Sequence, residues 1–321
     1  MKRLAVLTSG GDCPGLNACL RAVIRRALLA NLEILGIRRG FKGLMEGEVI
    51  PLDYKSTSGI INRGGTFLLS ARSEEFHRSI GRKKVAKTLI KHKIEGLVVI
   101  GGNGSLRGAW ELGKETSVPI IGVPKSIDND IGGTDYSIGF DTAVNTAVEA
   151  IDRIRDTATS HEQLFLVEVM GRTRGFLALA AGVAGGAEEI LIPETPTDIP
   201  RLCRKLEEGR KKGKRSTIIV VAEGDEAGGA FDIAKKIQRK TNYQIRVSIL
   251  GHQQRGGSPT AFDRILASQL GVGAVEALLK GAKRKVIGRV NGKLTLSSLD
   301  IAWKRAPKLN QNLVRLAELL S

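Results

Sequence analysis

The stretch Leu97-Val98-Val99-Ile100-Gly101-Gly102-Asn103-Gly104-Ser105 decides the fold class. Its four apolar residues predict a short buried strand, and the glycine-rich turn that follows leads into a helical pattern. A second unit of the same kind follows it, with a strand at 119–123 and the loop Pro124-Lys125-Ser126-Ile127-Asp128-Asn129-Asp130. Strands that alternate with helices predict an α/β protein with a parallel sheet, in which ligands bind at the carboxyl ends of the strands.

The same alternation continues almost to the C-terminus of the chain. The first strand is expected at 4–8, its loop at 9–15 and a helix at 16–29. Apolar residues at helical spacing from 140 to 155 predict a long amphipathic helix, after which the alternation restarts. We therefore expect this helix to cross into a second α/β lobe, although a length of 321 residues also allows one larger domain.

The composition is that of a soluble globular protein, with 42% hydrophobic and 26% charged residues. No apolar run approaches the roughly 18 residues of a membrane span, and the N-terminus lacks the features of a signal peptide. We therefore expect a cytoplasmic protein without a membrane partner. The three cysteines are odd in number and lack metal-type spacing, so free thiols are expected.

The formal net charge of +17 favours encounters with polyanions, whether these are phosphometabolites or nucleic acids. The basic runs at 82–84, 210–215 and 283–285 are dispersed, and aromatic residues, which would stack on bases, make up only 4% of the chain. Solvated helix faces explain these runs more simply. We do not expect nucleic acid as a partner.

Two glycine-rich loops and one acidic loop carry the chemistry. The loop 101–105 opens a helix, where free amides and the helix dipole can hold a polyphosphate; the loop 9–15 is a weaker signal that a tight turn also explains. Asp128 and Asp130 are two residues apart, so in an extended loop they point the same way. Such a pair suits one carboxylate as a base and the other toward Mg²⁺, with an ordinary Asp-rich turn as the alternative. Together the loops suggest phosphoryl transfer.

Taken together, the loops resemble those of bacterial 6-phosphofructokinases over nearly the whole chain. The motifs that carry the resemblance are, in order, LTSGGDCPGLNA, INRGGTFLLSAR, VVIGGNGS, PKSIDNDIGGTDYSIGFDTA, VEVMGRTRG and LGHQQRGGSPTAFDR. The resemblance implies two Rossmann-like, three-layer α/β/α lobes with mainly parallel sheets and the active site in the cleft between them. It assigns 1–139 and 254–304 to a nucleotide-binding lobe, and 140–253 and 305–321 to a sugar-phosphate-binding lobe. It also implies a homotetramer in which neighbouring subunits complete the sugar-phosphate site.

By position, the resemblance makes Asp128 the base that takes the proton from the sugar 1-hydroxyl. Arg172 is implied to stabilise the charge that builds on the transferred phosphoryl group. Ser126 and Asp130 are implied to line the transfer site, with Asp130 and Asn103 placed toward Mg²⁺. Phosphoryl transfer depends mostly on positioning and charge stabilisation, which fits this division of roles.

The resemblance also implies three sets of binding residues. The ATP set is Gly11, Phe41 as a candidate adenine platform, Arg72, Ser73, Gly102, Asn103, Gly104 and Ser105. The fructose 6-phosphate set is Ser126, Asp128, Gln163, Met170, Gly171, Arg172, Glu223, Arg246 from a neighbouring subunit, His252 and Arg255. The set for an allosteric nucleotide is Arg21, Arg25, Arg155, Glu188, Lys212 and Lys214.

The chain departs from the family pattern at several positions. Asn103 replaces an aspartate that faces Mg²⁺, which removes a full negative charge but keeps an oxygen ligand. Gln163 replaces an arginine that reaches the sugar phosphate across the interface, and Tyr54 stands where the allosteric site usually has arginine. Lys125 is typical of pyrophosphate-dependent and some ATP-dependent relatives, whereas Gly104 is typical of the ATP type because an acidic side chain there would obstruct the nucleotide.

The expected function is a Mg²⁺-dependent glycolytic kinase that converts fructose 6-phosphate to fructose 1,6-bisphosphate with ATP. Within the same family, the donor could be pyrophosphate or the acceptor another sugar phosphate such as sedoheptulose 7-phosphate. From a different class, Asn103 and Gln163 leave open a catalytically weakened paralogue that serves as a regulatory subunit. A second role of the basic surface in nucleic-acid binding also stays open, and it requires binding that weakens steeply with salt.

Overall fold

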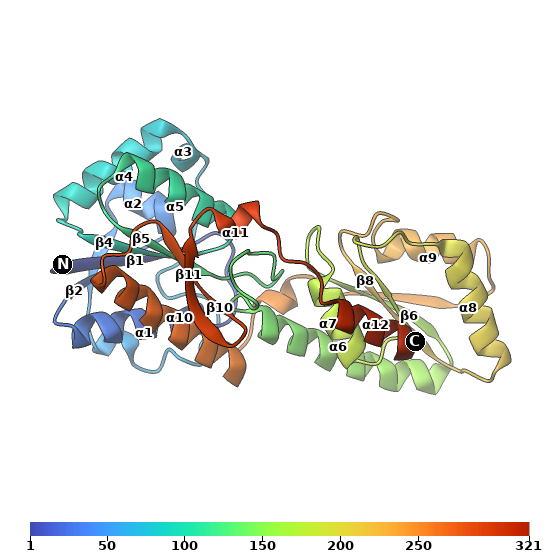
Figure 1. Cartoon of the computed structure of the whole chain (residues 1–321). Helices are drawn as coiled ribbons and strands as arrows, with labels where there is room; N and C mark the ends of the chain where they lie inside the picture. The colour runs from blue at the N-terminus through green and yellow to red at the C-terminus, as the bar shows by residue number, and fades with distance from the viewer. Residues whose placement is uncertain (321) are drawn as a thin grey trace. The chain divides into compact units, whose positions relative to one another are not determined.

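The computed structural model of the protein describes residues 1–320 and divides into two compact units (Figure 1). Unit 1 comprises Met1–Thr142 and Arg255–Pro307, and unit 2 comprises Ala143–Gln254 and the chain from Lys308 onward. The expected lobes ended at 139, 253 and 304, and the units end at 142, 254 and 307, so each crossing differs by three residues or fewer.

Unit 1 contains a seven-stranded sheet in the order β11-β10-β5-β4-β1-β2-β3. The strands are β1 (Arg3–Ser9), β2 (Glu33–Ile37), β3 (Val49–Leu52), β4 (Gly96–Gly101), β5 (Ile120–Pro124), β10 (Lys285–Val290) and β11 (Lys293–Ser298). The five inner strands are parallel, and β3 and β11 pair antiparallel at the two edges. All residues of β4 and β5 are buried, as expected for parallel strands that are covered on both faces.

Helices cover both faces of this sheet (Figure 1). The long helices α1 (Leu16–Leu29) and α10 (Ala261–Leu279) pack against each other on one face. The other face carries α2 (Gly40–Glu46), α3 (Glu74–His77), α4 (Ser79–Lys91), α5 (Asn103–Glu115) and α11 (Ile301–Lys304). A 3-10 turn, η1 (Lys55–Thr57), follows β3. The result is a three-layer α/β/α unit.

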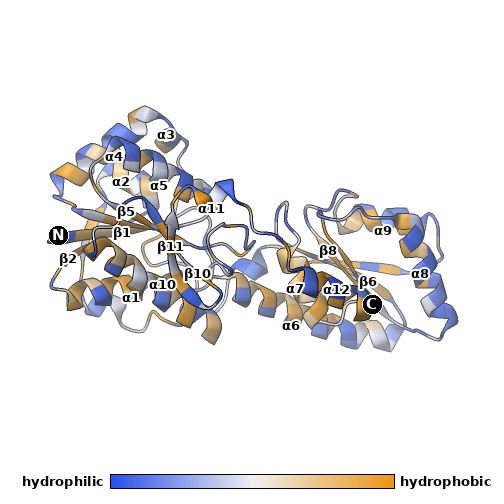
Figure 2. Cartoon of the chain, viewed as in Figure 1, coloured by the Kyte–Doolittle hydropathy of each residue, from blue (hydrophilic) through white to orange (hydrophobic). Residues whose placement is uncertain are grey.

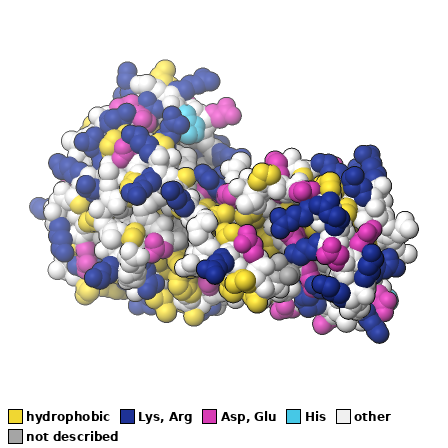
Figure 3. Space-filling model, turned by 45° about the vertical axis from the view of Figure 1, so that its right-hand side comes forward, with side chains coloured by type: hydrophobic (Ala, Val, Ile, Leu, Met, Phe, Trp, Pro, Cys, Tyr) yellow, Lys and Arg dark blue, Asp and Glu magenta, His cyan; other side chains and the backbone are white. Residues whose placement is uncertain are grey.

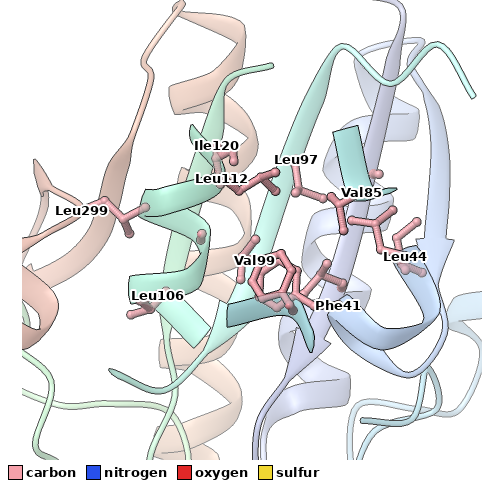
Figure 4. Packing of buried hydrophobic residues seen from close by; sticks show 14 of the residues in the cluster. Phe41, Leu44, Val85, Leu97, Val99, Leu106, Leu112, Ile120 and Leu299 are labelled. Carbon is pink, nitrogen blue, oxygen red and sulfur yellow. The ribbon is translucent and has the colours of Figure 1, made fainter. Parts of the chain in front are cut away.

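The core beneath α2, α4 and α5 is built from side chains that alternate along the strands (Figure 4). Leu97 and Val99 of β4 point into this cluster, where they meet Leu106 and Leu112 of α5. Alternate residues of a strand point to opposite faces of the sheet. The buried cluster therefore holds the start of α5 against the carboxyl end of β4.

Unit 2 contains a four-stranded, fully parallel sheet in the order β7-β8-β6-β9. Its strands are β6 (Leu164–Val169), β7 (Glu189–Leu191), β8 (Thr217–Ala222) and β9 (Ile245–Ile249). Its helices are α6 (Phe140–His161), α7 (Phe176–Ala184), α8 (Ile199–Lys211), α9 (Ala230–Gln238) and α12 (Gln311–Leu320), of which α6 starts in unit 1. A 3-10 turn, η2 (Gly251–Arg255), follows β9 and ends at Arg255, where the chain re-enters unit 1.

The helices of unit 2 are amphipathic, and their apolar faces form a second core. Leu202 and Leu206 of α8 and Ile233 of α9 join Leu166 and Ile219 of the sheet in one buried cluster. Figure 2 shows hydrophobic residues along the strands and many hydrophilic residues on α8. Each unit therefore has a hydrophobic core of its own.

Several expectations of the sequence are met at the level of elements. The helix expected at 16–29 is α1, and the helix expected from 140 is α6, which extends to His161. Elsewhere in unit 1, the Asn291-Gly292 turn joins β10 to β11 with positive φ at both residues, as a two-residue hairpin requires. Within residues 1–320, the helices all fall short of the length and apolar character that a membrane span needs.

Candidate active site

The N-terminus of α5 has no side-chain cap. Gly102 precedes the helix and provides no side-chain cap, and the first turn contains no acidic residue. The first amides of a helix have no partner within it, and they carry the positive end of the helix dipole. A Cβ built on Gly104 would have no neighbour within 4 Å among the described residues, so packing within the chain does not require glycine there.

A second glycine loop, Ser9 to Gly15, lies directly beside this helix start. The hydroxyl oxygens of Ser105 and Ser9 are 2.9 Å apart, and the ammonium of Lys125 donates to the carbonyl of Gly11. A Cβ on Gly11 would lie 1.6 Å from Nη2 of Arg255, so a side chain at position 11 would require this guanidinium to move. The two glycine loops expected to bind phosphate are therefore neighbours in unit 1.

Asn103 and Asp130 form a polar pair at the start of α5. Asn103 Nδ2 donates to Asp130 Oδ2 at 2.8 Å and approaches the Asp130 carbonyl at 3.3 Å. Both partner atoms are acceptors, so the amide nitrogen must face Asp130. Asn103 Oδ1 is buried and has no hydrogen-bond partner within residues 1–320. A buried oxygen without a partner is costly, so a water or a ligand that donates to this oxygen or is coordinated by it would stabilise the structure.

The Asp128 loop does not have the extended backbone assumed from the sequence. Asn129 has a φ of 50°, in the left-handed region, so the rule that residues two apart share a face does not apply to Asp128 and Asp130. This corrects the geometric argument for the pair. Asp128 is 5% exposed, and its amide donates to Ser126 Oγ at 3.1 Å.

In unit 2, the expected substrate residues gather at the carboxyl ends of the strands. Met170, Gly171 and Arg172 follow β6, and Glu223 follows β8. The Arg172 amide donates to Glu223 Oε1 at 2.7 Å, and Arg172 has a φ of 55°. Non-glycine residues in this region are strained and cluster at functional sites. The structure thus brings these four residues together.

Gln254 is a residue of this region that sequence reasoning missed. Its side chain is fully buried after β9, and its Oε1 accepts from the Met170 amide at 3.3 Å. The exposed His252 lies on the same 3-10 turn, η2. A buried glutamine in a polar, glycine-rich loop gives no signal in a single sequence, because only the fold buries it.

Two expected substrate residues lie at the opposite end of the same strands. Arg246 pairs in register with Phe165, near the amino end of β6, and its Nε approaches Gln163 Oε1 at 3.5 Å. Arg172 instead follows the carboxyl end of β6. The length of this strand therefore separates Arg246 and Gln163 from Arg172.

Comparison with known proteins identifies the family. The family model described as phosphofructokinase matches residues 3–278, which is most of the chain. The chain belongs to the phosphofructokinase family.

Relatives of high similarity match over their full length. A protein of Thermus thermophilus named ATP-dependent 6-phosphofructokinase 1 is 53% identical over 321 residues, with 100% of both chains covered. An ATP-dependent 6-phosphofructokinase of Bacillus pumilus is 52% identical over 322 residues, again with full coverage of both.

Solved structures agree with this fold. The phosphofructokinase of Pichia pastoris in its T-state matches 99% of this chain and 39% of its own, with a TM-score of 0.89 and 35% identity. A pyrophosphate-dependent phosphofructokinase of Marinobacter aquaeolei matches 100% of this chain and 91% of its own, with a TM-score of 0.85 and 23% identity. The second likeness shows the fold alone. The expected α/β fold with mainly parallel sheets is confirmed.

The phosphofructokinase resemblance assigned Phe41 as an adenine platform, and its geometry does not fit that role. Phe41 is 3% exposed and lies among the buried side chains of Figure 4. Its ring is stacked on Phe76, with the ring centroids 3.8 Å apart. The side chain belongs to the hydrophobic core of unit 1. Arg72 and Ser73 do line a surface hollow of about 330 Å³.

The residues expected to bind an allosteric nucleotide in this phosphofructokinase divide between the units. In unit 2, Arg155 and Lys214 approach Glu188 at 3.5 and 3.6 Å, and Lys212 lines the same hollow of about 380 Å³ as Glu188 and Lys214. In unit 1, Arg21 and Arg25 lie on α1. Tyr54 is 54% exposed, and its carbonyl accepts from Thr57 near Arg25.

The positive charge of the surface is dispersed on the face that Figure 3 shows. Lys and Arg side chains spread over this face and are interspersed with Asp and Glu. This distribution is typical of solvated helix faces.

Proposed function

We propose that the chain is an ATP-dependent 6-phosphofructokinase that phosphorylates the 1-hydroxyl of fructose 6-phosphate in glycolysis. One observation carries the proposal: the uncapped start of α5 and the Asn103–Asp130 pair adjoin the loop that contains Asp128. A candidate phosphate site, a candidate metal ligand and a candidate base are therefore close together in unit 1, which supports the proposal. Relatives that are 53% and 52% identical over their full length and are named ATP-dependent 6-phosphofructokinase support the same function.

Two residues bear on the choice of donor. The open space at Gly104 suits ATP, because a nucleotide needs more room than pyrophosphate. Lys125 is 5% exposed and donates to the Gly11 carbonyl, so its ammonium also helps to hold the glycine loop. Because this structural role also explains a lysine at position 125, Lys125 is only weak support for pyrophosphate as the donor. We therefore propose ATP as the donor.

The residues present fit Mg²⁺. Asn103 Oδ1, buried and without a partner in the described residues, and the Asp130 carboxylate are oxygen ligands of the kind that Mg²⁺ prefers. No group of three or more His, Cys, Asp or Glu side chains that could hold a metal occurs within residues 1–320. Mg²⁺ usually keeps several waters and shares its ligands with substrate phosphates, so Asn103 and Asp130 suffice as the protein's part. When bound, Mg²⁺ would neutralise charge on the phosphates of ATP.

The proposed chemistry assigns one role to each of three residues. Asp128 takes the proton of the sugar 1-hydroxyl while the oxygen of this hydroxyl attacks the terminal phosphorus of ATP. The bond from that phosphorus to the ADP oxygen then breaks. Ser126 lines the site of transfer. Arg172 lowers the energy of the charge that spreads over the transferred group.

The positions of Arg246 and Gln163 favour sugar-phosphate sites that are shared between subunits. Arg246 and Gln163 lie at the opposite end of β6 from Arg172, so an Arg246 that contacts sugar phosphate serves the site of another subunit. We therefore propose a homotetramer with shared sugar-phosphate sites.

Two further expectations stay predictions. One is a cytoplasmic location, and the other is an allosteric nucleotide site formed by Arg21, Arg25, Arg155, Glu188, Lys212 and Lys214.

The test is a direct assay of purified protein with fructose 6-phosphate and Mg²⁺, offered ATP or pyrophosphate in turn. We expect fructose 1,6-bisphosphate with ATP, and a loss of about 10³-fold or more in kcat for Asp128→Asn, which removes the base. Glu149→Gln, an exposed carboxylate paired with Arg153 on α6, is the matched control and should keep full activity.

Other outcomes would change the assignment. Turnover with pyrophosphate alone would overturn the donor. A folded tetramer without turnover on either donor would favour the regulatory paralogue. Full activity of Asp128→Asn would remove Asp128 as the base.

A further inference from the structure

The loop that carries Asp128 and Asp130 is closed at its base by backbone hydrogen bonds. The amide of Ser126 donates to the carbonyl of Ile138 at 3.1 Å, and the amide of Ile138 donates to the carbonyl of Pro124 at 3.2 Å. The Ser137 hydroxyl, fully buried, adds a bond of 2.6 Å to the Ser126 carbonyl. The ends of the loop are thus held together, and its interior must be ordered by other groups.

Asn129, between the two aspartates, orders the interior of the loop with its side chain. Nδ2 donates to the Asp135 carbonyl at 3.0 Å, and Oδ1 accepts from the Ser137 amide at 2.8 Å. The side chain is 8% exposed, so these bonds are shielded from water. One partner accepts and the other donates, so the two bonds require an amide in this orientation.

The backbone at Asn129 also requires a special residue. Its φ of 50° lies in the left-handed region, which asparagine adopts more readily than other non-glycine residues. This turn interrupts the extended chain between the two carboxylates. Asp130 can then meet Asn103 at the start of α5, while Asp128 keeps its separate place after Ser126.

We propose that Asn129 is a positioning residue, whose side-chain clamp on Asp135 and Ser137 holds the left-handed turn that assigns Asp128 and Asp130 to different tasks. Asn129 acts through its neighbours and does not itself touch the reacting atoms. The inference rests on the proposed kinase function, in which Asp128 is the base and Asp130 faces the metal. It predicts that loss of the clamp impairs the chemical step more than substrate binding.

The test replaces Asn129 with glycine, which accepts the same φ without strain and removes the clamp, at the cost of a more flexible backbone that the control also carries. We expect kcat to fall about 10- to 100-fold, as for other small misplacements of reacting groups, while KM for ATP and for fructose 6-phosphate changes less than about 3-fold. Asn31→Gly is the matched control, because Asn31 also has a left-handed φ of 57° but is exposed at the end of α1. This control should keep the wild-type kcat.

A second variant covers the case in which Asn129→Gly does not fold. Asn129→Asp keeps an acceptor for the Ser137 amide and the tolerance for positive φ but cannot donate to the Asp135 carbonyl. We expect kcat to fall at least as far as in Asn129→Gly, because the new carboxylate also adds a negative charge between Asp128 and Asp130. Each variant is compared with wild type by circular dichroism, and activity is measured well below its midpoint of thermal unfolding.

The outcomes separate the positioning role from the proposed function. An unchanged kcat in a folded Asn129→Gly, with an active wild type, would overturn the positioning role alone. A rise in both KM values at constant kcat would overturn it as well, because it would indicate lost binding. An inactive wild type would overturn the proposed function and, with it, the inference.

Discussion

Asn103 places a neutral amide where it donates directly to a carboxylate. An aspartate at this position would face Asp130 across the 2.8 Å now spanned by a hydrogen bond, and two carboxylates at that distance repel each other. A divalent cation relieves such repulsion and gains from the added charge. We therefore predict that Asn103→Asp tightens binding of free Mn²⁺, used as a probe for Mg²⁺, by about 10-fold.

Electron paramagnetic resonance of Mn²⁺ with nucleotide-free protein measures this affinity without reference to activity. Asn31→Asp introduces the same charge at an exposed site and is the control, for which no change is expected. Unchanged or weaker Mn²⁺ binding by Asn103→Asp would mean that the site has adapted around the amide.

At the scale of elements, the start of α6 in unit 1 is capped by a side chain of α10. Asp263 accepts from the amides of Gly139 and Thr142 at 2.9 and 2.8 Å and from the Thr142 hydroxyl at 2.5 Å. Its side chain is fully buried, and burial raises the pKa of this carboxyl. Its removal leaves two buried amides without an acceptor, and such groups cost about 1–3 kcal/mol each.

We predict that Asp263→Ala lowers the free energy of unfolding of unit 1 by about 2–4 kcal/mol, measured by denaturant titration. Asp53→Ala removes a similar acceptor from an exposed turn of unit 1, where Asp53 accepts from Ser56, and should cost about 1 kcal/mol or less. Equal losses for the two variants would contradict a role for Asp263 at the start of α6.

For the whole molecule, the cysteines report on the two cores separately. Cys13 and Cys19 are buried in unit 1, and Cys203 is buried in the core of unit 2. Burial raises the pKa of Cys13 to about 12 and also raises the pKa of Cys19, so little reactive thiolate forms at neutral pH. We predict that the native protein reacts only slowly with a thiol reagent at pH 8 and that three thiols react after denaturation.

Intermediate denaturant should separate the cysteines. The sheet of unit 2 has four strands against seven in unit 1, and a smaller core contributes less stability. Cys203 should therefore react at lower denaturant concentration than Cys13 and Cys19, as measured by pulsed labelling and peptide mass spectrometry. Simultaneous labelling of all three would indicate one cooperative unit.

Much of the fold could be predicted because its signals are local. The apolar run 97–100, the glycine turn after it and the apolar periodicity of α6 predicted elements that the structure contains. That the two glycine loops lie close together could be predicted from the expected parallel sheet, because the carboxyl ends of parallel strands share one edge. The extended Asp128 loop was wrong, and Phe41, a candidate adenine platform, is buried, because backbone conformation and burial depend on contacts distant in sequence.

The sequence by itself determined the alternation of strands and helices, the positions of the loops and the family. Periodicity, glycine turns and ordered motifs lie within short windows of the chain, so no folded coordinates are needed to read them. Only the tertiary structure decided that Arg255 occupies the space over Gly11, that Gln254 is buried beside Met170 and that Asn103 keeps one oxygen without a partner in the described chain. These facts depend on which side chains meet across long sequence separations, and packing settles that only once the sheets have formed.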